Sequence, residues 1–368
     1  MDKPQIVEFL TQSVNYSVFD VKWIPRTAKF IVVGSRPQGT GVLQVYELEE
    51  NTLQVRGEID REKSLKCASF GASSIRDYHV ALGDFNGNLT VLDVERPESP
   101  IYTVRAHTSI INSLDAIGGA LINCGAPEIV TGSRDGTVKV WDTRQADCPV
   151  ACVSPPSGCG GRDCWAVAFG NSFNNSERCL AAGYDNGDLK LIDLRKMSQR
   201  WETNLSNGVC SIEFDRNDIE MNKMVVATLE GGLYVYDMRT QHPKKGFACV
   251  TEKNAGRSLG SCGSITGSKS TVWMAKHLPQ NRDIFATGGG SGCVRLWNYE
   301  YPEKRKIAQP DGSEVGVEGN LQMLCSSVIS TQPVHCFDWC PDLLGLAVCG
   351  AFDQTVRVLI STKLNLYQ

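Results

Sequence analysis

The chain has 368 residues, which allows about two average domains or one large all-β domain. Its formal net charge is −4, from 37 Lys and Arg against 41 Asp and Glu, and the absence of a basic stripe argues against nucleic-acid binding. Hydrophobic residues make up 42% of the chain, which is too much apolar surface for a chain that stays disordered as a whole.

After Met1-Asp2-Lys3-Pro4, the sequence continues with a strand-like segment, Gln5–Leu10. No long apolar region accompanies it, so no secretory signal is expected. Later apolar runs, such as Phe30–Val33 and Met224–Ala227, are also strand-sized and far shorter than the ~18 residues that a membrane-spanning helix needs.

One pattern recurs seven times along the rest of the chain. Each copy has an apolar run, a polar turn and then alternating residues that end in an aromatic-acidic or similar pair; the clearest copy runs from Ile129 to Asp142. The turns are anchored at residues 41, 87, 136, 187, 231, 292 and 354. Alternation with a period of two indicates a strand with one buried face, and Asp-Gly or Asn-Gly favours a tight hairpin turn.

Each hairpin is flanked by two further strand-like segments, such as Val18–Trp23 upstream and Leu53–Ile59 downstream of the first. Four strands per repeat with a closing Trp-Asp pair are typical of a β-propeller blade. We therefore predict an all-β fold, a single seven-bladed WD-repeat propeller over residues 1–368. Residues 5–10 are expected to close the ring as the outer strand of the last blade, and insertions are expected at about 254–269 and 302–320.

The inner strands are expected to bring seven side chains to one mouth of the central channel. Counting four residues back from the late aromatic or its equivalent gives Phe19, Lys66, Asn112, Trp165, Cys210, Trp273 and His335. The neighbouring hairpin turns add Phe85, Arg134, Asp185 and Phe352. Because aromatic anchors dominate interface energetics, these residues are predicted to bind protein partners. The alternative is that Trp165 and Trp273 pack sideways between blades.

Three consecutive repeats end in Asp-x-Arg, which places Arg144, Arg195 and Arg239 on the other side of the disc. This pattern resembles the box by which some WD-repeat proteins dock on cullin–RING ubiquitin-ligase adaptors. The alternative is local pairing of each arginine with its own aspartate.

A third set of residues resembles the polar network that ties the strands of a WD repeat together. Its members are His107, Ser133, Asp135 and Trp141. Because buried polar groups need partners, we interpret them as scaffold.

The sequence does not predict an enzyme. It contains none of the nucleophile, phosphate-loop or zinc-protease motifs, and the inner strands are expected to offer mostly apolar residues to the channel. His335, Cys336 and Cys340 lie close together in the sequence but lack the two paired ligand sets of a zinc site. Neither a cofactor nor a metal is expected. The 15 cysteines are an odd number, and many lie in apolar runs, which indicates reduced thiols in a cytosolic or nuclear protein.

Several longer stretches are similar to the Monad-type WD-repeat proteins of the dynein axonemal assembly factor family. They include Arg162–Trp165, Ala182–Asp188, Asp237–Pro243 and Phe352–Ile360. The resemblance covers the chain except residues 254–268 and much of 302–320. At 254–268 a Gly/Ser-rich insertion replaces a short loop of the family.

This resemblance implies a non-enzymatic cytoplasmic adaptor. Such proteins are associated with a co-chaperone assembly of RuvB-like ATPases, PIH-domain, TPR and prefoldin-like subunits, and they support preassembly of axonemal dynein heavy chains. A link to apoptosis is also attached to the family. The resemblance further implies a monomeric propeller within a larger complex, with protein partners rather than nucleic acid or membrane.

Overall fold

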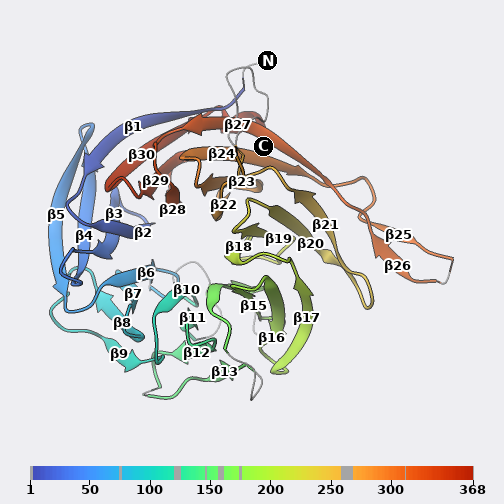
Figure 1. The fold of residues 1–368 in the computed structure, drawn as a ribbon, viewed down its shortest axis with the longest axis horizontal. Helices are drawn as coiled ribbons and strands as arrows, with labels where there is room; N and C mark the ends of the chain where they lie inside the picture. The colour runs from blue at the N-terminus through green and yellow to red at the C-terminus, as the bar shows by residue number, and fades with distance from the viewer. Residues whose placement is uncertain are drawn as a thin grey trace.

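The computed structural model describes residues 3–73, 77–119, 126–145, 147–155, 161–173, 176–257, 268–310 and 312–367. Within these residues, thirty strands form seven four-stranded antiparallel sheets and one two-stranded sheet. The seven sheets are arranged as blades in a ring (Figure 1). The predicted seven-bladed propeller is therefore confirmed. No helix within the described part is long and apolar enough to cross a membrane.

Each of the first four blades uses four strands that follow one another in the chain, from the inner to the outer edge. Blade 1 contains β2 (Ser17–Trp23), β3 (Lys29–Ser35), β4 (Gly41–Glu49) and β5 (Thr52–Arg61). Blade 2 contains β6 (Leu65–Ser69), β7 (His79–Asp84), β8 (Asn88–Asp93) and β9 (Tyr102–Arg105). Blade 3 contains β10 (Ile111–Ile117), β11 (Glu128–Ser133), β12 (Val138–Asp142) and β13 (Ala151–Val153). Blade 4 contains β14 (Cys164–Gly170), β15 (Cys179–Tyr184), β16 (Asp188–Asp193) and β17 (Ser198–Asn204).

Blade 5 keeps this order, and the last two blades depart from it. Blade 5 contains β18 (Val209–Phe214), β19 (Lys223–Thr228), β20 (Leu233–His242) and β21 (Gly246–Glu252). Blade 6 contains β22 (Val272–Leu278), β23 (Asn281–Gly289), β24 (Cys293–Glu300) and β27 (Asn320–Val328), so a hairpin interrupts it. Blade 7 contains β28 (Val334–Trp339), β29 (Leu346–Ala351), β30 (Thr355–Thr362) and, at its outer edge, β1 (Gln5–Ser13). A short 3-10 helix, Leu364–Tyr367, follows.

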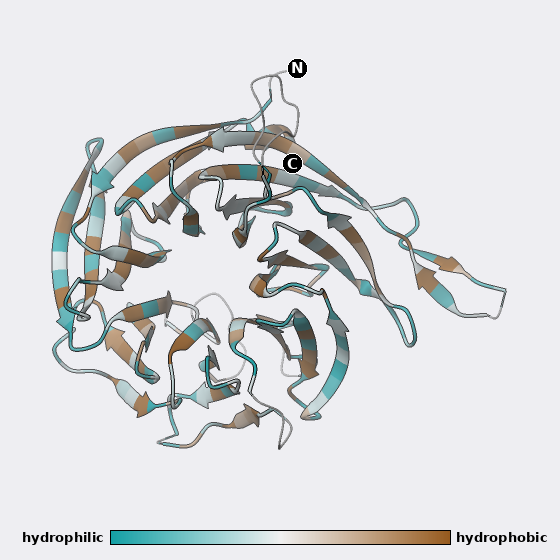
Figure 2. Cartoon of the chain, viewed as in Figure 1, coloured by the Kyte–Doolittle hydropathy of each residue, from teal (hydrophilic) through white to brown (hydrophobic). Residues whose placement is uncertain are grey.

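The apolar core lies between neighbouring blades. The second strands are buried almost throughout, as in β29, whereas outer strands such as β5 alternate between exposed and half-buried residues. One core cluster joins Val33 and Leu43 of blade 1 to Leu65 and Leu82 of blade 2. Figure 2 shows the same distribution, with hydrophobic residues concentrated on the inner and middle strands. Because each blade has two apolar faces, it needs a neighbour on each side, and a closed ring supplies both.

The N-terminal strand closes the ring as predicted. β1 pairs antiparallel with β30 from Gln5 opposite Thr362 to Ser13 opposite Thr355. The carboxylate of Glu8 also lies 3.3 Å from the guanidinium of Arg357 on β30. The two ends of the chain are thus joined in one sheet.

The hairpin within blade 6 consists of β25 (Lys306–Ala308) and β26 (Glu314–Gly316). It extends beyond the edge of the disc (Figure 1). At its base, the guanidinium of Arg305 forms an ion pair with the fully buried Asp237 of blade 5. Part of the other expected insertion, residues 258–267 of 254–269, lies outside the described residues.

Candidate functional site at the mouth of the central channel

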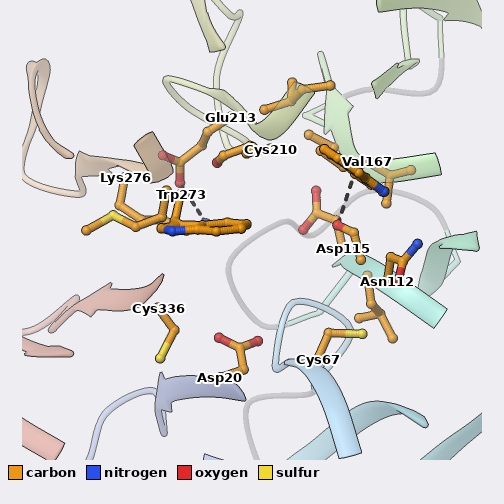
Figure 3. Close-up of a pocket in the computed structure, with 18 of the residues that line it drawn as sticks. Asp20, Cys67, Asn112, Asp115, Val167, Cys210, Glu213, Trp273, Lys276 and Cys336 are labelled. Carbon is orange, nitrogen blue, oxygen red and sulfur yellow. Dashed lines mark hydrogen bonds and ion pairs between the residues drawn. The ribbon is translucent and has the colours of Figure 1, made fainter. Parts of the chain in front are cut away.

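The inner strands surround a cavity of about 480 Å³ that draws its lining from all seven blades. All seven positions predicted from the spacing contribute to this lining: Phe19, Lys66, Asn112, Trp165, Cys210, Trp273 and His335. In Figure 3, Trp273, Asp115 and Asp20 point from three different blades toward one central space. The fold therefore brings together the seven residues that the spacing predicts at the mouth.

A bulge in each inner strand explains why these seven side chains face the channel. On β2, Val18 pairs with Gly34 and Asp20 pairs with Val33, so Phe19 has no partner on β3. The same shift occurs at the other six mouth positions. A bulge leaves one residue out of the ladder and re-aims its side chain. No residue type in the sequence marks these bulges.

Aromatic rings cluster on one side of this mouth. Phe19 packs against Phe85 with ring centroids 5.3 Å apart, and Phe352 stacks on His335 at 4.2 Å and 15°. The ring of Trp273 meets Phe352 edge to face at 6.4 Å. We call Phe19, Phe85, Trp273, His335 and Phe352 the aromatic mouth. Two of its members, Phe85 and Phe352, come from hairpin turns, so turns and inner strands contribute to one surface.

Trp165 occupies a different position, between blades. A Cβ atom added at Gly208, just before β18, would lie 2.5 Å from Cζ3 of Trp165, so the indole covers this glycine of the next blade. Trp165 also lines the channel. Asn112 donates its side-chain amide to the carbonyl of Cys164 at 2.9 Å. These residues both face the channel and join neighbouring blades.

Two further predicted residues, Arg134 and Asp185, lie near Asp163. The guanidinium of Arg134 is 3.6 Å from the Asp163 carboxylate and its side chain is 62% exposed. The backbone N–H of Asp185 donates to the Asp163 carbonyl at 3.0 Å. Arg134 therefore adds an exposed positive charge to this face, close to one carboxylate.

Below the mouth, four carboxylates form a feature that the sequence interpretation missed. We call Asp20, Asp115, Glu213 and Asp338 the carboxylate belt. Each accepts a hydrogen bond from a backbone N–H on the inner strand of the next blade. The donors are Ala68 to Asp20 at 3.0 Å, Phe169 to Asp115 at 2.8 Å, His277 to Glu213 at 2.7 Å and Trp23 to Asp338 at 2.8 Å. The belt therefore joins blades 1 to 2, 3 to 4, 5 to 6 and 7 to 1.

The expectation that the inner strands offer mostly apolar residues to the channel leaves out a set of charged groups. Besides the belt, Lys22 lies 2.7 Å from Asp20 and Lys276 lies 3.2 Å from Glu213. These polar residues alternate with core residues on the same strands, and alternation alone does not reveal which face lines a channel. Because the belt carboxylates accept backbone N–H bonds, we interpret them as links between blades.

The net pKa shift differs among the carboxylates of the belt, although burial raises the pKa of each carboxyl with a resolved shift. It raises the pKa of Asp338 to about 6 against the opposing effect of Lys22, and it raises the pKa of Asp115. Burial also opposes ionisation of Glu213, but Lys276 and His277 outweigh it and lower the pKa of that carboxyl. The direction of each shift therefore follows the local supply of positive charge.

The predicted scaffold residues His107, Asp135 and Trp141 form one network in blade 3. Nδ1 of His107 lies 3.2 Å from the Asp135 carboxylate, and Nε1 of Trp141 donates to the hydroxyl of Thr131 at 3.0 Å. The Thr131 hydroxyl is also 2.7 Å from Nε2 of His107, so Thr131 connects Trp141 with His107. Ser133 sits beside this chain, where its hydroxyl accepts the backbone N–H of Asp135 at 3.1 Å.

The three arginines of the Asp-x-Arg pattern have different surroundings. The guanidinium of Arg144 donates to both carboxylate oxygens of its own Asp142, at 2.7 Å for the shorter Nη2 bond. Arg239 forms an ion pair with Glu220, and Arg195 is exposed. In the third copy of the Asp-x-Arg pattern, Asp237 forms an ion pair with Arg305 at the base of the blade 6 hairpin.

Comparison with known proteins agrees with this geometry. Residues 98–142, which include the His107–Trp141 network, match the family model described as WD domain, G-beta repeat. Dynein axonemal assembly factor 10 of Xenopus laevis is 55% identical over 365 residues, which cover 99% of this chain and 98% of that protein. This chain belongs to the dynein axonemal assembly factor 10 family. The relatives named so in Homo sapiens and Chlamydomonas reinhardtii are 54% and 52% identical over 364 residues, again covering 99% of this chain and 98% of theirs. The resemblance found in the sequence is therefore confirmed.

Proposed function

We propose that this member of the dynein axonemal assembly factor 10 family is a non-enzymatic cytoplasmic adaptor for the assembly of axonemal dynein. In this proposal it links the co-chaperone assembly of RuvB-like ATPases and prefoldin-like subunits to dynein heavy chains. The observation that carries the proposal is the aromatic mouth on a closed ring, in a chain that aligns with the named relatives over 99% of its length. A stiff scaffold that positions aromatic anchors suits protein binding.

The mouth is tested by removing its two tryptophans. Trp165→Ala together with Trp273→Ala should reduce co-purification of RuvB-like ATPases or dynein heavy chains from ciliated cells, as measured by quantitative mass spectrometry. Because Trp165 also packs on Gly208, Phe352→Ala serves as a milder second variant; its side chain is 47% exposed. Trp201→Ala, on the outer strand β17, is the control for loss of a large ring elsewhere. Unchanged co-purification by folded mouth variants would contradict the proposed site.

Docking on a cullin–RING ubiquitin-ligase adaptor remains a second candidate with less support. Arg144 and Arg239 both form ion pairs within the chain, so an adaptor would have to compete for them. Arg144→Ala, Arg195→Ala or Arg239→Ala would abolish adaptor binding if this candidate were right. A wild-type pull-down from the same cells that contains no adaptor would eliminate it. The link to apoptosis has no counterpart in the geometry of the described residues.

A further inference from the structure

Lys66 brings a positive charge to the mouth. It lies at a bulge on β6, and its ammonium stands 4.6 Å from the centroid of the Phe19 ring. Within the described residues it forms neither an ion pair nor a hydrogen bond. A cation held over an aromatic face is attracted only weakly, whereas a partner carboxylate adds a charge-assisted hydrogen bond.

The carboxylate of Asp20, on the preceding blade, already accepts hydrogen bonds from other groups. One oxygen of Asp20 accepts the N–H of Val21 at 2.9 Å and Lys22 at 2.7 Å, and the other accepts the N–H of Ala68 at 3.0 Å. Burial therefore prevails at Lys66 and lowers its pKa. The belt leaves this ammonium without a carboxylate of its own.

Lys66 is also the positive charge that distinguishes the aromatic mouth. Burial, assisted by Lys66 itself, lowers the pKa of His335 to about 4, so this imidazole is neutral at pH 7. Arg134 on the same face has Asp163 beside it. Among the residues that the structure describes, an incoming ligand therefore meets one lysine ammonium without a carboxylate partner, at the edge of an aromatic surface.

The apolar half of the surface is partly open. Phe352 is 47% exposed although it stacks on His335 and meets Trp273. An exposed ring held from two sides offers a rigid face to an apolar side chain. Such a surface beside a lone cation is complementary in shape and charge to an acidic group followed by an apolar one.

We propose that the mouth binds an extended peptide in which a carboxylate pairs with Lys66 and a neighbouring aromatic or aliphatic side chain packs on Phe352. This inference rests on the proposed function, because it assigns a partner chemistry to the same mouth. The expected peptide contains acidic and apolar residues, and not basic or neutral ones, at the positions that contact the mouth.

A random 12-residue peptide library displayed on phage, selected against the full-length protein, tests the chemistry. The expected result is enrichment of Asp or Glu next to Phe, Trp, Leu or Ile. Selection against Lys66→Glu should lose the acidic residues. Selection against Lys244→Glu, which makes the same charge change at an exposed lysine in the β20–β21 turn, should keep them. Enrichment of neutral or basic sequences, or no enrichment of acidic-apolar ones, would overturn the proposal.

A second measurement uses the best fluorescein-labelled peptide from that selection. Lys66→Met, which keeps the length of the side chain, should weaken binding roughly tenfold at low salt and flatten its dependence on NaCl between 50 and 300 mM. Phe352→Ala should weaken binding while the salt dependence persists. Binding that Lys66→Met leaves unchanged would refute the ion pair. Co-purification lost with the tryptophan variants but retained with Lys66→Met would leave the proposed function standing and this inference wrong.

Discussion

The Thr131 hydroxyl joins the side chains of Trp141 and His107. The hydroxyl accepts a hydrogen bond from Trp141 Nε1 and lies 2.7 Å from Nε2 of His107, whose Nδ1 faces Asp135. Thr131→Val should therefore leave two buried polar atoms unsatisfied and lower the free energy of unfolding by ~1–3 kcal/mol, as measured by urea denaturation. The matched control is Thr287→Val in blade 6, where the described side-chain bond is with Trp297 alone at 2.8 Å. Equal losses in the two variants would contradict the linking role of Thr131.

Asp353 gives a prediction for the pH dependence of stability. Burial opposes its ionisation, but Arg357, Thr355 and Ser330 outweigh it and lower its pKa to about 2. Because the folded pKa lies below the unfolded value, the carboxylate stabilises the protein fully above about pH 5, by about 2 kcal/mol, and this contribution falls as the pH drops from 4 toward 2. The difference in unfolding free energy between wild type and Asp353→Asn should therefore shrink to roughly half at pH 3. A difference that is constant from pH 7 to pH 3 would rule this out.

Among the elements, β1 carries the largest expected effect. Its pairing with β30 closes the ring, and Glu8 adds an ion pair to Arg357. Deleting residues 5–10 exposes the edge of β30 and the apolar face beneath, so we expect a sharp fall in melting temperature in a thermal scan. Val7→Ser, on the exposed face of the same strand, keeps the pairing and should stay within about 0.5 kcal/mol of wild type. A deletion variant with an unchanged melting temperature would show that the ring does not depend on this strand.

The elements also show what the sequence can predict. The hairpins were predictable because a tight turn restricts its residues: the anchors Gly87, Gly136 and Gly187 all have positive φ, between 81° and 89°. The bulge at Phe19 was not predictable, since a bulge is a shift between two strands and leaves no residue type of its own. For the same reason the sequence placed Trp165 at the mouth but left open its packing on Gly208.

On the scale of the whole molecule, the ring has seven blade interfaces, and the carboxylate belt crosses four of them. A buried N–H such as that of Phe169 needs an acceptor that its own sheet does not provide, and Asp115 supplies it from the preceding blade. In a closed ring, each blade is held on both sides, so loss of one interface weakens the entire structure. The belt thus turns separate sheets into one cooperative unit while it keeps charged groups inside the channel.

Substitutions at Asp115 can separate the contribution of its hydrogen bond between blades from the contribution of its charge. Asp115→Leu removes the acceptor of the Phe169 N–H and should cost ~1–3 kcal/mol in urea unfolding, whereas Asp115→Asn keeps an acceptor oxygen and should cost less. Since burial raises the folded pKa of Asp115, the ionised form opposes folding at neutral pH, and wild type should gain stability relative to Asp115→Asn as the pH falls from 7 toward 4. Both variants should still unfold in a single transition that fluorescence and circular dichroism report together. Equal losses for Leu and Asn at pH 7 would mean that the charge, and not the bond between blades, is what this position contributes.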